Sequence, residues 1–434
     1  MATLIRPVKG TRDFYPKQMA LRSWLYGQLR AVAERYGYQE YDAPILETLE
    51  LYAAKSGDEL VKEQSFAFAD RGGDMLVLRP ETTPSLARMI AQRQQALPKP
   101  IRWWTFGPCW RYEQPQQGRT REFYQWNLDL IGAASVYADA EVLMVITDLL
   151  RTLGLTGEQV TIRLSHRDMM SVQLQQIGVT PIQLDAAYRL IDRREKLSHD
   201  GWWAYGQGHL GFTMSQLTAM EALLGNRDLW KTCPDLVSIF AQGDEFGYGE
   251  FLEFDPTMIR GLGYYTGMVF EAWDRERAFR AILGGGRYGN LVADVGGQPL
   301  GGIGVGMGDV VLGLVLERCG LLPSLAPSPA EVLVTVFSPE LQSTSMRLAK
   351  QLREAGMRTE LYPDPVKLHR QLKYANTQGI PRVLVCGPEE VARGVVTVRE
   401  MASGEQHLVQ LADLAVFMQE QPGTVCELPA STHE

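Results

Sequence analysis

The chain has few cysteines, and none of them lies in a metal-binding pattern. There are five in 434 residues, an odd number, and no two are spaced as CxxC: Cys109, Cys233, Cys319, Cys386 and Cys426. This spacing argues against a disulfide framework and against a structural zinc site. Histidine is also scarce, and the six histidines show no ligand spacing. We therefore assign no residue as a metal ligand.

Long apolar segments are missing from the sequence as well. No run of about 18 apolar residues occurs, which predicts no membrane span. The first 13 residues carry Arg6, Lys9 and Arg12 and lack the apolar centre of a secretory signal, so we expect a reduced, cytoplasmic setting. The net charge of −8 gives no bulk signal for nucleic acid, although a local basic face can still bind RNA.

What is present is an ordinary globular mixture, with 45% apolar and 22% charged residues. A length of 434 residues predicts two or three domains. Residues 321–330 hold three prolines and two serines, which is typical of a linker. We therefore predict a core at residues 1–325 and a compact α/β domain at residues 331–425, where strand and helix patterns alternate.

The core carries strand patterns on both sides of a helical segment. Residues 101–112 and 121–131 predict two strands around a polar loop. Thr83 followed by Pro84 predicts an N-cap and the first residue of a helix. Residues 166–245, approximately, show helical runs and few strand signals, which indicates a helical insertion. The fold class we predict is α+β, with an antiparallel sheet flanked by helices.

Two glycine-rich segments invite a nucleotide-binding interpretation. Residues 284–286 are three glycines, but the Lys-Ser/Thr that follows in a phosphate-binding loop is missing. Residues 302–306 form a lone GxGxG, which is weak as a dinucleotide fingerprint. We interpret the second segment as close packing of backbone near a nucleotide pocket.

One polar loop and its flanking strands carry a specific pattern. Residues 106–113 read Phe-Gly-Pro-Cys-Trp-Arg-Tyr-Glu and are followed by Arg119, Arg121, Phe123 and Gln125. This resembles the second signature of class II aminoacyl-tRNA synthetases, in which a strand ends in Arg-x-Glu and an aromatic residue lies on the returning strand.

Further segments narrow the resemblance. Residues 260–267 read Arg-Gly-Leu-Gly-Tyr-Tyr-Thr-Gly and resemble a stretch peculiar to the histidine enzymes. Residues 7–13 and 78–81 look like theirs too, and the last domain is similar to their anticodon-binding domain. The chain therefore resembles the histidyl-tRNA synthetase family over nearly its whole length, in the right order.

The resemblance implies an enzyme that activates L-histidine with ATP and loads it onto tRNA-His. Histidine's carboxylate must attack an anionic phosphate, and guanidinium groups neutralise the charge that concentrates there. By resemblance, Arg111 and Arg260 are catalytic and hold the α-phosphate and the carboxylate. The residues expected to bind ATP are Arg111, Glu113, Arg121, Phe123 and Arg260. Mg2+ is expected to bridge the phosphates.

The same resemblance implies a polar pocket for histidine. Glu81, Thr83 and Gln125 are expected near the amino group, whereas Asp129 and the pair Tyr264-Tyr265 are expected around the imidazole. In full, the residues expected to bind histidine are Glu81, Thr82, Thr83, Arg111, Gln125, Asp129, Arg260, Tyr264 and Tyr265. The early helix and residues 38–44 resemble the first class signature, which forms dimers, so a homodimer is also predicted.

The sequence departs from the family pattern at two positions. Gly263 stands where the family usually has Asp, and Asp309 stands where the third signature carries an arginine near the γ-phosphate. An aspartate there repels the triphosphate unless it is turned away. Arg287 and Arg121 are the candidates for supplying the missing cation.

Other functions remain compatible with parts of the pattern. The regulatory subunit of ATP phosphoribosyltransferase shares the catalytic fold and senses histidine, but it lacks the terminal α/β domain. An inactive RNA-binding paralogue would share most of these residues, and Arg111, Phe123 and Arg260 argue against it. A class II synthetase for threonine or proline is disfavoured by the double tyrosine and Asp129. Taken alone, Arg111 pairing with Glu113 could be a structural ion pair.

Overall fold

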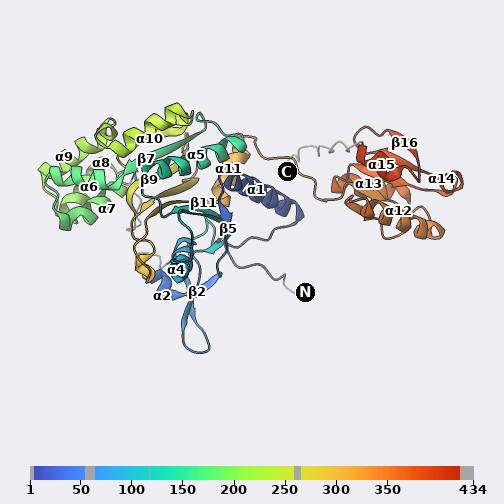
Figure 1. Ribbon diagram of the computed structural model, residues 1–434, viewed down its shortest axis with the longest axis horizontal. Coiled ribbons are helices and arrows are strands. Elements are labelled where there is room, and N and C mark those ends of the chain that lie inside the picture. The colour runs from blue at the N-terminus through green and yellow to red at the C-terminus, as the bar shows by residue number, and fades with distance from the viewer. Residues whose placement is uncertain (1–3, 54–63, 117, 259–264, 421–434) are drawn as a thin grey trace. The chain divides into compact units, whose positions relative to one another are not determined.

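The computed structural model describes residues 4–53, 64–116, 118–258 and 265–420. The chain divides into two compact units, one formed by residues 1–13 and 26–322 and the other by residues 14–25 and 323–434. Helix α1 (Pro16–Arg35) runs across this division. Each unit is built on its own β-sheet (Figure 1).

The first unit contains an eight-stranded sheet whose inner pairs are all antiparallel. Within this sheet, only the edge pairs β1–β5 and β7–β8 are parallel among the pairs that the structure describes. The α+β fold predicted from the sequence is therefore confirmed. In spatial order the strands are β1 (Gln39–Glu40), β5 (Ile101–Trp110), β6 (Glu122–Ile131), β11 (Gly302–Gly308), β10 (Leu283–Tyr288), β9 (Tyr265–Asp274), β7 (Val160–His166) and β8 (Leu252–Phe254).

One face of this sheet, here called the back face, is apolar and covered by helices. Successive residues of a strand point to opposite faces, so Trp126, Leu128 and Leu130 of β6 share the back face, and all are buried. Helix α5 (Val136–Thr152) packs against β11 and α11 (Asp309–Arg318) packs against β6. On this side Arg102 of β5 forms an ion pair with Glu141 of α5, with a separation of 2.8 Å.

The opposite face, here called the front face, is polar at its centre. It carries Phe123, Gln125, Asn127 and Asp129, which alternate with the buried residues of β6. Helix α4 (Thr83–Arg93) packs on this side in a cluster that includes Val269, Tyr265 and Tyr288. The N-cap of α4 is Thr82, so our assignment of Thr83 as the cap was wrong by one residue. The predicted start of the helix is nevertheless close to the observed one, because Pro84 still lies in the first turn, where its missing N–H is tolerated.

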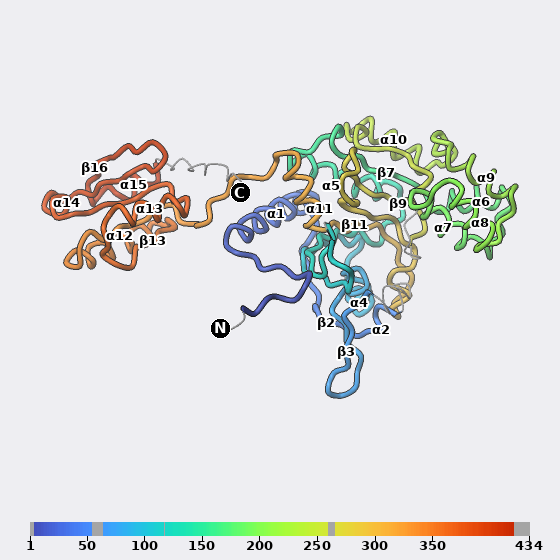
Figure 2. Tube along the Cα trace, turned by 180° about the vertical axis from the view of Figure 1, so that it is seen from behind, coloured from blue at the N-terminus to red at the C-terminus, as the bar shows by residue number. Residues whose placement is uncertain are grey.

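Two smaller elements complete the first unit. A three-stranded sheet joins β2 (Leu46–Thr48), β4 (Met75–Leu78) and β3 (Phe66–Ala69), followed in sequence after β2 by the short helix α2 (Leu49–Ala53). Between β7 and β8 the chain forms a helical insertion, as the sequence predicts, and its helices group beside β7 and β9 (Figure 2). They are α6 (Arg167–Gln176), α7 (Leu184–Asp192), α8 (His199–Gly208), α9 (Met214–Gly225) and α10 (Pro234–Glu245).

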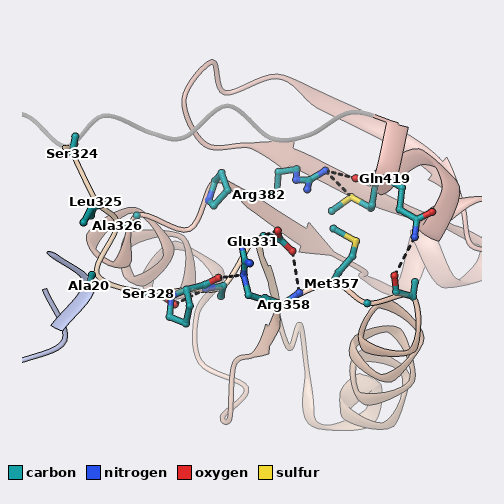
Figure 3. A pocket seen from close by; sticks show the side chains of 17 residues that line it. Ala20, Ser324, Leu325, Ala326, Ser328, Glu331, Met357, Arg358, Arg382 and Gln419 are labelled. Carbon is teal, nitrogen blue, oxygen red and sulfur yellow. Dashed lines mark hydrogen bonds and ion pairs between the residues drawn. The ribbon is translucent and has the colours of Figure 1, made fainter. Parts of the chain in front are cut away.

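The second unit is the α/β module. Its sheet joins β13 (Thr359–Leu361), β12 (Val332–Val334), β14 (Arg382–Val385), β15 (Val395–Glu400) and β16 (Gln406–Gln410), and its helices are α12 (Gln342–Glu354), α13 (Leu368–Gln378), α14 (Pro388–Arg393) and α15 (Leu414–Glu420). The strand pairs that include β12 are parallel, and the other two pairs are antiparallel. Figure 3 shows how buried Arg382 donates to the carbonyl oxygen of Met418 at 3.0 Å, close to the Arg358–Glu331 ion pair. Burial lowers the pKa of Arg382.

Across the helices that the structure describes, none is both long and apolar enough to cross a membrane.

Two glycines predict opposite responses to the same substitution. A Cβ on Gly285 in β10 would lie 2.1 Å from the carbonyl oxygen of Gly304 and 2.5 Å from the Phe270 ring, whereas a Cβ on Gly313 in α11 would meet nothing within 4 Å. Gly285→Ala should destabilise the first unit by about 1–3 kcal/mol through overpacking. Gly313→Ala should stabilise it by about 0.5–1 kcal/mol because glycine weakens a helix interior. Urea unfolding of both variants and of the wild type measures their free energies of unfolding. Equal free energies for the two variants would contradict this packing.

Candidate active site

The front face borders a cavity of about 640 Å3, which is within the usual size of a small-molecule site. Arg111, Phe123 and Gly308 line it from the sheet side. The end of α7 and the turn that follows it line it from the insertion, through Glu195, Lys196 and neighbouring residues. The sheet and the insertion therefore form one site together.

The β5–β6 hairpin presents a cation beside an aromatic ring. Arg111 follows β5, and its guanidinium carbon lies 5.3 Å from the centre of the Phe123 ring on β6. Its Nε donates to the carbonyl oxygen of Pro80 at 3.1 Å, and its backbone N–H donates to Arg121 at 2.9 Å. These contacts fix the direction of the guanidinium. The structure thus brings together Arg111 and Phe123, both predicted to bind ATP.

The loop of the hairpin carries two more of the predicted ATP ligands, Glu113 and Arg121. Glu113 forms an ion pair with Arg119, and its side chain is only 8% exposed. Arg121 donates from Nε to the carbonyl oxygen of Glu113 at 3.1 Å, and its guanidinium lies over the Tyr112 ring at 4.6 Å. Both Glu113 and Arg119 line the cavity. The loop is therefore held by its own charged side chains.

Glycines make room for the polar row on β6. In the register of β6 and β11, Gly304 pairs with Asp129 and Gly306 pairs with Asn127. A Cβ on Gly304 would lie 2.1 Å from Asp129 Oδ1, and one on Gly306 would lie 2.3 Å from Gln125 Nε2. Only glycine leaves this space on the front face. This confirms that the GxGxG segment packs backbone closely beside the site.

The polar row leaves three acceptors for a ligand. Gln125 Oε1, Asn127 Oδ1 and Asp129 Oδ2 are buried and have no hydrogen-bond partner among the described residues. Buried acceptors in folded proteins are nearly always paired, so such a group needs an explanation. Three of them on one face of one strand form a set of acceptors that would suit a molecule with several N–H donors.

Asp129 lies at the deepest point of the row. It is 2% exposed, and the hydroxyl of Tyr288 on β10 donates to its Oδ1 at 2.6 Å. Burial raises the pKa of Asp129 to about 7, partly offset by the Tyr288 hydrogen bond. The sequence analysis named Asp129 but missed Tyr288 and Asn127. Asn127 was accessible from the two-residue spacing with Gln125 and Asp129, whereas Tyr288 comes from a distant strand.

The remaining predicted residues lie around this row. Glu81 and Thr82 precede α4 and are 5% and 0% exposed, and the hydroxyl of Tyr52 donates to the carbonyl oxygen of Glu81 at 3.0 Å. Thr83 is the first residue of α4. Tyr265 pairs with Tyr288 in the register of β9 and β10. Two predicted residues lie outside the described residues: Arg260 and Tyr264.

One of the two candidates for the missing third-signature cation, Arg287, is held away from the cavity. Arg287 contacts Asp139 of α5 at 2.8 Å and donates to the carbonyl oxygens of Ala133 and Ser135, and these contacts lie on the back face. Arg121 is fixed in the loop as described above. Asp309 instead pairs with Arg12 at 2.8 Å, which the sequence analysis did not foresee.

The raised pKa of Asp129 predicts a pH-dependent stability. An unfolded aspartate has a pKa of about 3.9, so between about pH 4 and the folded value of about 7 the folded chain binds the extra proton. The contribution of Asp129 to folding therefore becomes less favourable as the pH rises through this window. Asp129→Asn should raise the melting temperature by several degrees at pH 8 and by much less at pH 5. Asp185→Asn, at an exposed position, is the control. An equal change in melting temperature for Asp129→Asn at pH 5 and pH 8 would contradict the burial of Asp129.

Two family models match most of the chain. The histidyl-tRNA synthetase family model matches residues 10–308, and the anticodon binding domain model matches residues 331–421. A histidine–tRNA ligase from Haloarcula marismortui is 40% identical over 419 residues, covering 93% of this chain and 95% of the relative. The Arabidopsis thaliana protein named histidine–tRNA ligase, chloroplastic/mitochondrial is 36% identical, covering 94% of this chain and 86% of the relative.

Solved structures show the same fold. The crystal structure of histidyl-tRNA synthetase from Nostoc sp. PCC 7120 is 24% identical and superposes with a TM-score of 0.82, covering 96% of this chain and all of that one. A Bacillus halodurans structure titled as an ATP phosphoribosyltransferase regulatory subunit/histidyl-tRNA synthetase is 22% identical, with a TM-score of 0.71 and coverages of 87% and 97%. At these identities the structures establish the fold, and the matched family model and the curated relatives establish the family. The chain belongs to the histidyl-tRNA synthetase family.

Proposed function

We propose that this protein is a histidine–tRNA ligase that converts L-histidine and ATP to histidyl-adenylate and transfers histidine to the 3′ end of tRNA-His. One observation carries the proposal. Strand β6 places an aromatic ring under a fixed guanidinium, and the same strand face continues into three buried acceptors without partners among the described residues. A nucleotide suits the first part, and a small molecule rich in N–H donors suits the second.

The nucleotide is proposed to bind along the β5–β6 hairpin. The flat ring of Phe123 suits the face of adenine, and Glu113 offers acceptors at the adenine edge. Arg111 suits the α-phosphate, together with Arg260, which is assigned by family resemblance. Arg121 is proposed to face the outer phosphates. Permanent positive charge is the property that the reaction needs from these three arginines.

Histidine is proposed to bind over the polar row. Asp129 accepts a hydrogen bond from the imidazole, and Tyr264, Tyr265 and the newly recognised Tyr288 surround the ring. The amino group needs acceptors, which Gln125 Oε1, Glu81 and the hydroxyl groups of Thr82 and Thr83 supply. A pocket built on buried hydrogen bonds rejects analogues that lack the matching donors.

The chemistry then follows from position and charge. The histidine carboxylate attacks the α-phosphorus of ATP, the bond to the β-phosphate breaks, and pyrophosphate leaves. Arg111 and Arg260 stabilise the charge on the α-phosphate and orient the carboxylate. In the second step a terminal ribose hydroxyl of the tRNA attacks the histidyl carbonyl carbon, and AMP leaves with the bonding electrons.

Mg2+ is proposed to accompany ATP. Among the described residues no group of three or more His, Cys, Asp or Glu side chains could hold a metal. Mg2+ commonly binds through substrate phosphates, waters and one or two carboxylates. Glu271, on the front face of β9, lines the cavity and is the carboxylate we propose for it. When bound, the ion would neutralise phosphate charge.

The second unit is proposed to bind the anticodon of tRNA-His. We propose that the anticodon-binding domain comprises residues 331–425 and that the catalytic core comprises residues 1–325. Its matched family model supports this. Exposed side chains at the start of α13 and along it provide a local basic face: Lys367, His369, Arg370 and Lys373. Such a face suits an RNA backbone even though the chain is acidic overall.

The regulatory-subunit alternative is less well supported. The similar Bacillus halodurans structure carries the names of both proteins, so the fold alone does not separate the two activities. The curated relatives described above carry the name histidine–tRNA ligase, and this chain has the anticodon binding domain. Both findings favour the ligase.

Histidine-dependent exchange of pyrophosphate into ATP, without tRNA, tests the proposal. The purified chain should exchange with histidine and not with threonine or proline, and Arg111→Ala should lower the rate at least about a hundredfold because a transition-state contact is lost. Histidine binding without exchange would instead favour the regulatory or inactive alternatives.

A homodimer is also proposed, from the resemblance of the early helix to the dimer-forming signature. Large apolar side chains near the start of the described chain are exposed, namely Leu4, Ile5 and Val8, which suits a contact with a second copy. Light scattering at micromolar concentration should give about twice the chain mass of 48.6 kDa. A stable species of single-chain mass would refute the dimer.

A further inference from the structure

Asp309 begins helix α11, directly after the Gly308 that lines the cavity. Its carboxylate accepts a hydrogen bond from the backbone N–H of Tyr124 at 2.9 Å and pairs with Arg12 at 2.8 Å. The Asp309 side chain is 8% exposed and that of Arg12 is 28% exposed. The pair is therefore partly shielded from water, where a charge-assisted hydrogen bond is stronger than at an open surface.

Arg12 belongs to a segment that lies against the nucleotide-binding hairpin. The carbonyl oxygen of Gly10 accepts hydrogen bonds from the backbone N–H groups of Arg121 at 2.8 Å and Glu122 at 3.2 Å. The carbonyl oxygen of Lys9 accepts from Arg121 Nη1 at 3.4 Å. Lys9 and Gly10 thus accept three hydrogen bonds from Arg121 and Glu122, at the end of the loop between β5 and β6.

The fit of this segment is tight. Gly10 has a φ of +88°, and a Cβ there would lie 2.8 Å from Arg121 Cγ and 2.9 Å from Pro115 Cγ. The loop is also hydrogen-bonded to the residue that follows β5, because the carbonyl oxygen of Arg121 accepts from the backbone N–H of Arg111. A displacement of residues 9–12 would therefore be transmitted to both arginines.

We propose that Arg12 is a positioning residue for ATP, which through its ion pair with Asp309 holds residues 9–12 against the β5–β6 hairpin. The inference rests on the proposed function and extends it to a residue outside the cavity lining. The pair has two effects. It anchors the segment that orients Arg121 and Arg111, and it neutralises a carboxylate next to the cavity that would otherwise repel the triphosphate.

The same pair explains how the chain functions with an aspartate at this position. Asp309 is turned away from the cavity, toward Arg12 and Tyr124, while its neighbours Gly308 and Val310 line the cavity. As the first residue of α11, its negative charge is also favoured by the helix dipole. Asp309 therefore acts as the anchor for Arg12 and does not contact ATP.

The test uses pyrophosphate exchange at varied ATP and varied histidine on the full chain. Arg12→Met should raise the KM for ATP about fivefold to thirtyfold, as expected for loss of one charge-assisted hydrogen bond, with little change in the KM for histidine. Arg12→Lys should restore part of the ATP affinity. Asp309→Asn, which keeps an acceptor for the Tyr124 N–H, should raise the KM for ATP as Arg12→Met does, and the double variant Arg12→Met/Asp309→Asn should be little worse than either single variant because both changes remove the same ion pair.

Arg30→Met is the matched control, because it removes an exposed arginine that pairs with Glu34 on α1. It should leave both KM values unchanged. Titration of each variant with a non-hydrolysable ATP analogue gives the affinity without requiring turnover. Loss of exchange in the wild type would count against the proposed function, whereas weaker analogue binding in Arg12→Met would still support the positioning role.

Three results would overturn the inference. The first is an Arg12→Met variant with wild-type affinity for ATP and its analogue. The second is an equal rise in the KM for ATP and for histidine, which indicates general loosening of the fold. The third is a double variant Arg12→Met/Asp309→Asn whose rise in the KM for ATP is the product of the two single effects, which indicates that the two residues act independently.

Discussion

The active site depends on the alternation of side chains along one strand, β6. Its buried back-face residues Trp126, Leu128 and Leu130 are apolar and lie on the side covered by α5 and α11, whereas its front face carries the Phe123 ring and the polar row from Gln125 to Asp129. This division works only because the neighbouring strands leave space above the row. Gly304 and Gly306 on β11 leave the volume that Asp129 and Gln125 occupy, and Gly285 lets β10 approach β11 closely. The glycines are thus a property of the site, and no phosphate-binding loop is needed to explain them.

Burial of the polar row destabilises the folded chain, but the same buried groups can recognise a ligand. Burying a carboxyl group without full pairing opposes folding, and the raised pKa of Asp129 records that opposition. A ligand with N–H donors removes the penalty when it binds, so part of the binding free energy comes from acceptors that are otherwise unsatisfied. The same reasoning explains selectivity, since a molecule without those donors gains nothing from the row.

Local sequence patterns predicted the parts of the site that lie in single segments. The hairpin with Arg111 and Phe123 could be recognised because a strand, a loop and a returning strand follow one another within about 30 residues, whereas Gln125 and Asp129 were expected from the family resemblance alone. Tyr288 was missed because its place opposite Asp129 depends on the order of β6, β11 and β10 in the sheet. The three-residue strand β2 was missed because so short a segment has no measurable period. Strand order and tertiary pairing are not encoded in any one window of sequence.

The Asp309 position shows why a single departure from a family pattern is a poor guide to function. Judged alone, it removes a cation and adds an anion beside a triphosphate site. In the folded chain, however, the anion pairs with a cation 297 positions earlier in the sequence, and the loop between β5 and β6 lies against that same N-terminal segment. A charge change at one position can be balanced by a residue that only the fold brings near, so the relevant unit for judging it is the local cluster of Arg12, Asp309 and Arg121.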